Sequence, residues 1–269
     1  MPMNPRLLRP LATRGLDADA RTYIAAVEAA DGETLEQGVK TAINDFIVGC
    51  KSDGIWDAIK ASCILAGART LAGALVPLKG GGPTNVNNNF TESDYNRETG
   101  LVGDGSTTSL NTNRDNNADP QNDNHNALYI TAANTNDPAV YMGSDGSASA
   151  GFNQLTIASG AGAGTLVSAS RNGALLSDVV AGGGNQLGFH GSSRSSSSEY
   201  VVRVLGANTT HFRASVSPTS SDVHVFARGP TPAVFNDARI AFYSIGESLD
   251  LAALDTRVSA LITAIGNAL

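Results

Sequence analysis

The pattern of apolar and polar positions along the chain changes near residue 80. Before that point, apolar residues recur every three or four positions, the spacing of amphipathic helices. After it, short runs rich in Val, Leu, Ile, Phe, Tyr and Thr alternate with clusters of Gly, Asn and Ser, which is typical of strands joined by turns. The pattern therefore predicts a small helical part followed by a mainly β part.

Three helices are expected in the first part. The first begins at Asp17, a good N-cap residue, and Gly32 ends it. The second covers residues 33–51, where the apolar residues form one stripe, and the third covers residues 55–66. Together they are expected to enclose a small core around Trp56, the single tryptophan of the chain.

Short strands are expected throughout the region after residue 84. Their expected bounds are 128–132, 140–142, 155–158, 165–171, 174–180, 187–190, 200–205, 211–216, 223–228 and 240–245. The pair Asn172-Gly173 lies between two of these strands and favours a two-residue hairpin turn. Strands at this spacing predict an antiparallel sandwich or barrel.

The end of the chain returns to helical spacing. Ser248 is expected to cap a helix over residues 248–269. The apolar stripe of this helix consists of Leu251, Leu254, Val258, Leu261 and Ile265. A stripe of this length most often seals a helix onto its own domain, and the alternative is a bundle of several copies at a three-fold axis.

These elements predict a chain of five parts. They are an extended arm at 1–16, a helical anchoring module at 17–79, a linker at 80–83, a β-sandwich domain at 84–247 and a C-terminal helix at 248–269. The arm contains three prolines together with Arg6, Arg9 and Arg14, and it has no acidic residue. An extended segment without a core of its own gains order by docking, so we expect these arginines to contact a partner subunit.

The charge distribution narrows the range of partners. The 269 residues include 18 basic and 25 acidic side chains, which give a net charge of −7, and every lysine lies before residue 80. Binding to nucleic acid is not expected, because it depends on clustered Lys and Arg. No apolar run is long enough to span a membrane, and no secretory signal is recognisable at the start. We therefore expect folding in a cytoplasm.

Few residues suggest redox or metal chemistry. Cys50 and Cys63 are expected to be buried free thiols rather than a disulfide. The segment 111–124 is rich in oxygen ligands, and Asp115, Asp119 and Asp123 are weak candidates for binding calcium. Their spacing of four fits no EF-hand, so a polar loop rich in turns is the favoured interpretation. The four histidines show no metal-ligand spacing.

Several segments resemble structural proteins of tailed phages. Residues 235–249 (FNDARIAFYSIGESL), followed by the striped helix, resemble the last strand and terminal helix of concanavalin A-like (laminin G-like) sandwiches in such proteins. Residues 28–32, 42–46 and 54–63 are similar to a module that recurs beside these sandwiches. The resemblance implies a jelly-roll, concanavalin A-like sandwich in a virion component, assembled in the host cytoplasm. That family's sandwich often binds glycans, sometimes with calcium.

The favoured hypothesis is an adhesive component of a tail fibre. It would be a homo-oligomer, with a trimer favoured, that is anchored to other virion proteins and exposes its sandwich to a host surface glycan. The serine-rich run 192–198 is interpreted as an exposed loop tip, so Arg194 and Tyr200 are the candidate glycan contacts. A capsid decoration, cement or head-fibre protein is the alternative.

A glycan depolymerase on the same fold is the less favoured alternative. Such enzymes need two carboxylates that face one groove. The acidic residues beyond residue 150 do not occupy alternate positions of any expected strand. We therefore expect no catalytic residues and no enzyme activity.

Overall fold

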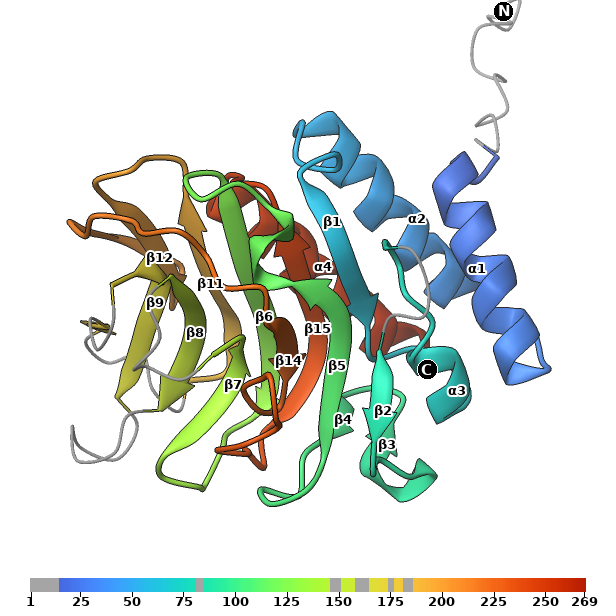
Figure 1. Ribbon diagram of the computed structural model, residues 1–269. Coiled ribbons are helices and arrows are strands. Elements are labelled where there is room, and N and C mark those ends of the chain that lie inside the picture. Colours follow the sequence, from blue (N-terminus) through green and yellow to red (C-terminus); the bar gives the residue numbers. More distant parts are fainter. Residues whose placement is uncertain (1–14, 81–84, 146–150, 158–164, 174–176, 181–185) are drawn as a thin grey trace, which may run out of the picture.

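The computed structural model describes residues 15–80, 85–145, 151–157, 165–173, 177–180 and 186–269. Two antiparallel sheets pack face to face, and helices cover the outer face of one of them (Figure 1). The expected mainly β sandwich with helices at both ends is confirmed. No helix among these residues is both long and apolar enough to cross a membrane.

The first sheet, called sheet A here, has eight strands, and the second, sheet B, has seven. In spatial order sheet A contains β13 (Ala207–His211), β12 (Tyr200–Val204), β11 (Gly188–Arg194), β6 (Asn124–Ala132), β15 (Arg239–Gly246), β4 (Gly100–Val102) and β3 (Tyr95–Asn96), while β1 (Ile59–Ile64) pairs with β15 beside β4. Sheet B contains β10 (Asp178–Val180), β9 (Leu166–Asn172), β8 (Phe152–Ile157), β7 (Ala139–Gly143), β14 (Asp222–Val225), β5 (Ser109–Asp115) and β2 (Val86–Asn88).

The helices are α1 (Ala18–Asp31), α2 (Gln37–Ser52), the short α3 (Leu71–Ala74) and α4 (Leu251–Ala268). Two single 3₁₀ turns, Glu92–Asp94 and Asn116–Ala118, join strands. The first two helices are confirmed. The Asp17 side chain accepts a hydrogen bond from the backbone N–H of Asp19, and Gly32 ends α1 with a left-handed φ of 69°.

Two apolar cores lie on the two faces of sheet A. The core between the sheets includes Leu128, Leu155, Val202, Val225 and Tyr243. The core between sheet A and the helices includes Ile24, Phe46, Phe189, Phe242 and Leu254. The central strands of sheet A are therefore buried on both faces and carry apolar residues toward each of them.

The expected third helix is wrong. Residues 59–64 form β1, which pairs with β15 and places Ile64 opposite Phe242. Ile59 belongs to the core under the helices, whereas Cys63 belongs to the core between the sheets. A register shift between Ile59 and Ala61 turns Ile59 to the opposite face from Cys63, so the alternation along this strand does not mark a single buried face.

The expected boundary at residues 80–83 does not coincide with the start of the sandwich. β1 precedes this boundary but belongs to sheet A, and α1, α2 and α4 share one core with the outer face of that sheet. Residues 81–83 of the expected linker lie outside the described residues. Both cysteines are free and buried, as expected, although Cys63 lies in a strand.

The C-terminal helix α4 packs its apolar stripe against sheet A of the same chain. Its N-cap is Asp250 rather than Ser248, and the Asp250 carboxylate accepts hydrogen bonds from two backbone N–H groups of the first turn. All five stripe residues from Leu251 to Ile265 are at most 2 % exposed within the single chain. The alternative of a bundle at a three-fold axis through this stripe is therefore wrong.

Most of the expected strands are present, with shifted ends. The expected strand at 211–216 is wrong, because the chain pairs earlier, over β13. The five strands before β6 were not expected, since β2 and β5 are mostly polar, β3 and β4 have only two and three residues, and the sequence of β1 was interpreted as a helix. β9 and β10 pair antiparallel, with Ser168 opposite Asp178, but Asn172 is the last residue of β9, so the expected two-residue turn at Asn172-Gly173 is wrong. Residues 174–176 lie outside the described residues.

Candidate functional site

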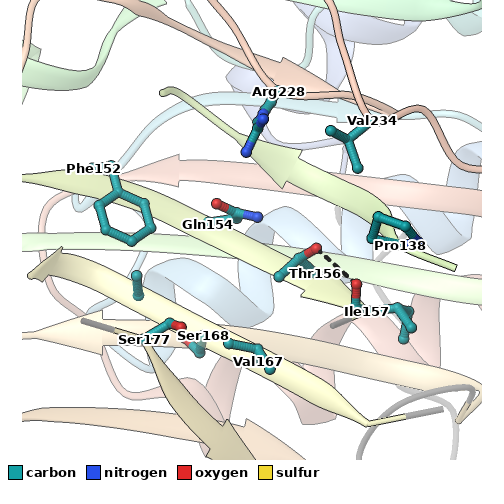
Figure 2. A pocket seen from close by; sticks show the side chains of 11 residues that line it. Pro138, Phe152, Gln154, Thr156, Ile157, Val167, Ser168, Ser177, Arg228 and Val234 are labelled. Atoms are coloured by element: carbon teal, nitrogen blue, oxygen red, sulfur yellow. Dashed lines mark hydrogen bonds between the residues drawn. The ribbon is translucent and has the colours of Figure 1, made fainter. Parts of the chain in front are cut away.

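A cavity of about 250 Å³ lies on the face of sheet B that points away from sheet A. Along β8, Phe152, Gln154 and Thr156 point into this cavity, whereas Leu155 points into the core between the sheets (Figure 2). The described lining residues are Pro138, Phe152, Gln154, Thr156, Ile157, Val167, Ser168, Ala169, Ser177, Arg228 and Val234. The volume is at the lower end of ligand pockets and suits one small ring.

The floor of the cavity is apolar and firmly packed. Phe152 and Ile157 of β8 and Val167 of β9 are all nearly inaccessible to solvent. Thr156 adds no free polar group, because its hydroxyl donates to the carbonyl of Ala139 at 2.7 Å. A ligand on this floor would rest against hydrocarbon, and its orientation would depend on the remaining polar groups.

Two polar side chains can supply that orientation. Gln154 is only 8 % exposed, and its Oε1 atom is buried without a hydrogen-bond partner among the described residues. A buried acceptor without a partner costs about 1–3 kcal/mol, so a ligand that donates a hydrogen bond to it recovers that cost. The half-buried Arg228 points toward Gln154 from the opposite wall (Figure 2).

Arg228 gives the cavity a positive wall. Within the described part of the chain, its guanidinium forms no hydrogen bond or ion pair. Its backbone is tied to Ala233 by two hydrogen bonds, so the segment that carries it is held over β8. The described lining includes no Asp or Glu. The arrangement can bind a small donor-bearing ring with an anionic substituent, and its described residues include no pair of carboxyl groups.

Sequence reasoning did not identify Gln154 and Arg228 as a site. Phe152, Gln154 and Thr156 share a strand face, and that alternation can be read from the sequence. Nothing in the sequence shows that the segment with Arg228, about seventy residues further along, crosses that face.

The two expected glycan contacts are in the interior, so the expected exposed loop is wrong at these positions. Strand β11 continues through Arg194, which is 0 % exposed, and Tyr200 of β12 is 1 % exposed. The tip of the serine-rich run is confined to residues 195–198, which carry mostly exposed side chains. A run of serines resembles a loop in the sequence, but serine also fits a strand whose neighbours supply hydrogen bonds.

Arg194 acts as a structural brace. Its guanidinium donates to the carbonyl of Ser170 at 2.7 Å and to the side-chain oxygen of Asn172 at 3.2 Å. It also donates to three loop carbonyls, those of Ser196, Glu199 and Arg213, each at 3.0 Å. Desolvation lowers the pKa of Arg194, but the five acceptors satisfy the buried group and join β11 to β9.

Tyr200 has a similar role beside this brace. Its hydroxyl lies 2.9 Å from the Ser168 carbonyl and 3.0 Å from the carboxylate of Asp178. Burial raises the pKa of this phenol well above its ordinary value. Asp178 also accepts from the guanidinium of Arg213 at 2.8 Å. These bonds join β12 to sheet B, so the phenol is a donor within the fold.

The three calcium candidates do not come together. Asp119 forms an ion pair with Arg114, and Asp123 accepts a hydrogen bond from the backbone N–H of Ser248. Asp115 ends β5 and shares a hydrogen bond with Asp222. Among the described residues, no group of three His, Cys, Asp or Glu side chains could hold a metal ion.

The pairing of Asp115 with Asp222 is a feature that sequence reasoning missed. Strand β14 brings Asp222 opposite Asp115, and the hydrogen bond between the two carboxyls raises the pKa of Asp115. The amide of Asn111 donates to Asp222 at 2.8 Å. Neither carboxyl lines the cavity of sheet B, so the pair does not convert that cavity into a hydrolytic site.

The other candidate positions from the sequence are the arm arginines and the histidines. The arm arginines Arg6, Arg9 and Arg14 lie outside the described residues. Three of the four histidines are at most 2 % exposed, and His211 is also largely covered. Burial lowers the pKa of His125, His211 and His224, so these imidazoles are neutral near pH 7.

No protein-family model matches the sequence, and no curated protein matches it. Several solved structures are similar in fold. The binding domain of botulinum neurotoxin serotype D is 11 % identical over 76 % of this chain and 51 % of its own, with a TM-score of 0.48. Domains LG4-5 of the mouse laminin α1 chain are 16 % identical over 61 % of this chain and 46 % of theirs, with a TM-score of 0.38.

A third solved structure is the binding domain of botulinum neurotoxin DC in complex with SialylT. It is 13 % identical over 57 % of this chain and 39 % of its own, with a TM-score of 0.39. The chain thus spans about half the length of the first of these structures. At such identities the likeness concerns the fold alone.

Proposed function

We propose that this chain is a non-catalytic adhesin of a phage tail, in which the cavity on sheet B holds one sugar ring of a host surface glycan. The phage assignment rests on the sequence resemblance of residues 235–249 and of the helical segments. The glycan assignment rests on the unpartnered Oε1 of Gln154, which lies beneath the guanidinium of Arg228. A sugar hydroxyl supplies the missing donor.

The cavity favours an acidic sugar over a neutral one. Arg228 presents planar donors to a carboxylate, and such charge-assisted bonds contribute about 1.5–3 kcal/mol, or roughly ten- to a hundredfold in affinity. Val167, the most accessible of the three apolar floor residues, offers its side chain to the C–H side of the ring. Contacts to a single ring are weak, so firm attachment requires several copies on one particle.

The test uses glucuronate and glucose, a pair that differs by the carboxylate. Saturation-transfer NMR titrations of the full chain should show tighter binding of glucuronate than of glucose. Arg228→Gln should weaken glucuronate by at least about tenfold and leave glucose unchanged, because only the charge-assisted bonds are lost. Gln154→Leu should weaken both sugars.

The control is Arg21→Gln, which removes an exposed charge from α1 in the helical layer. It should change neither affinity. The proposed site would be contradicted if the Arg228→Gln variant bound glucuronate as tightly as the natural chain does. It would also be contradicted if neither glucuronate nor glucose showed saturation transfer with the natural chain.

The arm with Arg6, Arg9 and Arg14 is proposed to attach the chain to other virion proteins. What supports this is its composition, which is basic and rich in proline without an apolar stripe. A chain with all three arginines replaced by Ala should bind sugar normally and enter particles poorly.

A further inference from the structure

Strand β13 is an unusually open edge of sheet A. Among the edge strands that the structure describes, β3 has two residues, β2 and β10 have three each and β13 has five. β1 has six, but its outer side is bridged at Ser62 by Lys79. The side chains of residues 207–210 are exposed, and among the described strands β13 pairs with β12 alone. A strand of this length presents a row of backbone donors and acceptors to any second strand.

The turn before β13 decides which backbone groups point outward. Leu205 and Gly206 both have positive φ, 52° and 73°, as in a two-residue type I′ turn. Such a turn makes Val204 and Ala207 a hydrogen-bonded pair, and the pairing then alternates along the strands. The N–H and C=O groups of Asn208 and Thr210 therefore point away from β12.

The sequence of β13 does nothing to block a second strand. Natural edge strands are protected by Lys, by Pro, by inward charges or by a bulge. Residues 207–211 (ANTTH) contain no proline and no Lys, Arg, Asp or Glu, and their register with β12 runs without interruption. The two threonines are β-branched and favour the extended conformation.

We propose that two copies of this chain pair antiparallel through β13, about a two-fold axis at Thr209, and join their A sheets into one. In this register Asn208 of each copy lies opposite Thr210 of the other, so the outward backbone groups of both residues meet partners. Thr209 is the one position of the strand that faces itself across the axis.

The exposed apolar side chains beside β13 fit the same register. Phe212, which follows the strand, is 79 % exposed, and Leu205 in the turn is 60 % exposed. The register places Phe212 opposite Gly206 of the other copy and next to that copy's Leu205. A Cβ built on Gly206 meets nothing within 4 Å, so the ring has room there.

The pairing does not compete with the fold already described. The apolar stripe of α4 is buried inside the chain, so it is not available to join copies. Five paired residues form a contact well below the roughly 1,000 Å² of a stable interface, and the dimer is therefore concentration-dependent. Crowding of copies on one particle favours it, and each dimer presents two sugar cavities.

Sedimentation velocity of the full chain tests this pairing. Between about 5 and 500 µM, the range expected for a small interface, the mass should rise from one chain toward two. Thr209→Lys and Thr209→Glu should each need at least about tenfold more protein to dimerise, because like charges would face each other across the axis. An equimolar mixture of the two variants should restore the dimer.

Two further variants serve as controls. Thr209→Val keeps the backbone donor and the β-branched shape, so it should dimerise like the natural chain. Thr210→Pro should abolish the dimer and leave the melting temperature unchanged, because the lost N–H makes no bond to β12. A chain that stays monomeric, a mass of three chains, or a Thr209→Lys variant that still dimerises would overturn the proposal.

Discussion

At the scale of single residues, His125 shows how burial determines charge. Its Nδ1 lies 2.5 Å from the Glu247 carbonyl, which can only accept, so Nδ1 carries the proton and Nε2 accepts from the hydroxyl of Ser244 at 2.8 Å. Both ring nitrogens are satisfied in the neutral form. Burial lowers the pKa of His125 to about 4.

This shift predicts a loss of stability at mildly acidic pH. The unfolded histidine takes up a proton near pH 6.5, whereas the folded one takes it up only near pH 4. The contribution of His125 is therefore fully present above about pH 6.5 and decreases by about 3 kcal/mol as the pH falls to 4. Urea unfolding of the natural chain and of His125→Gln, at pH 7 and pH 5, measures the difference in slope.

His125→Gln keeps one donor and one acceptor but no longer titrates. Its free energy of unfolding should change less between pH 7 and pH 5 than that of the natural chain. The two remaining histidines with lowered pKa, His211 and His224, are present in both proteins and cancel in the comparison. Parallel pH profiles would show that His125 is not the group that titrates.

Residue-scale predictions from the sequence succeeded where the neighbours along the chain decide the outcome. Asp17 caps α1 because its side chain bonds a backbone N–H two residues away. Arg194 was misplaced because its environment comes from Ser170, Asn172 and Arg213, and only pairing between strands brings these residues together.

At the scale of elements, the heptad-like stripe of α4 packs within its own chain and not against another helix copy. Leu254 is 0 % exposed and belongs to the core between the helices and sheet A. Leu254→Ala should lower the free energy of unfolding by about 2–5 kcal/mol, because it leaves a cavity in that core. Chemical unfolding monitored by circular dichroism measures this loss.

The matched control on the same helix is Thr263→Ala, which alters an exposed side chain and should change stability by less than about 0.5 kcal/mol. The mass of the Leu254→Ala variant at a given concentration should equal that of the natural chain. If the Leu254→Ala variant had a lower mass in solution than the natural chain and lost little free energy of unfolding, this stripe would instead lie between copies.

At the scale of the whole molecule, residues 15–80 pack as part of the sandwich. β1 lies beside β15, Phe46 of α2 packs against Phe242 of β15, and α1 belongs to the same core. A chain that begins at residue 85 should therefore fail to fold, because it exposes the outer face of sheet A. A chain that begins at residue 15 should melt at the temperature of the full chain. Thermal melts followed by circular dichroism compare the two.

Cooperative folding of the chain from residue 85 would show that the expected boundary near residue 80 is real. Failure of the chain from residue 15 would mean that the arm also contributes to the core. The expected result, folding from residue 15 only, makes the helices and the sandwich one cooperative unit.

Local chemistry determined the helix ends at Asp17 and Gly32, the amphipathic stripes of α2 and α4 and the mainly β class, because each depends on residues close together in the chain. Tertiary structure decided the strand character of β1, the burial of Arg194 and Tyr200, the meeting of Asp115 with Asp222 and the cavity between Gln154 and Arg228. Each of these depends on segments distant in sequence, whose packing sets the accessible surface and the hydrogen-bond partners of every side chain.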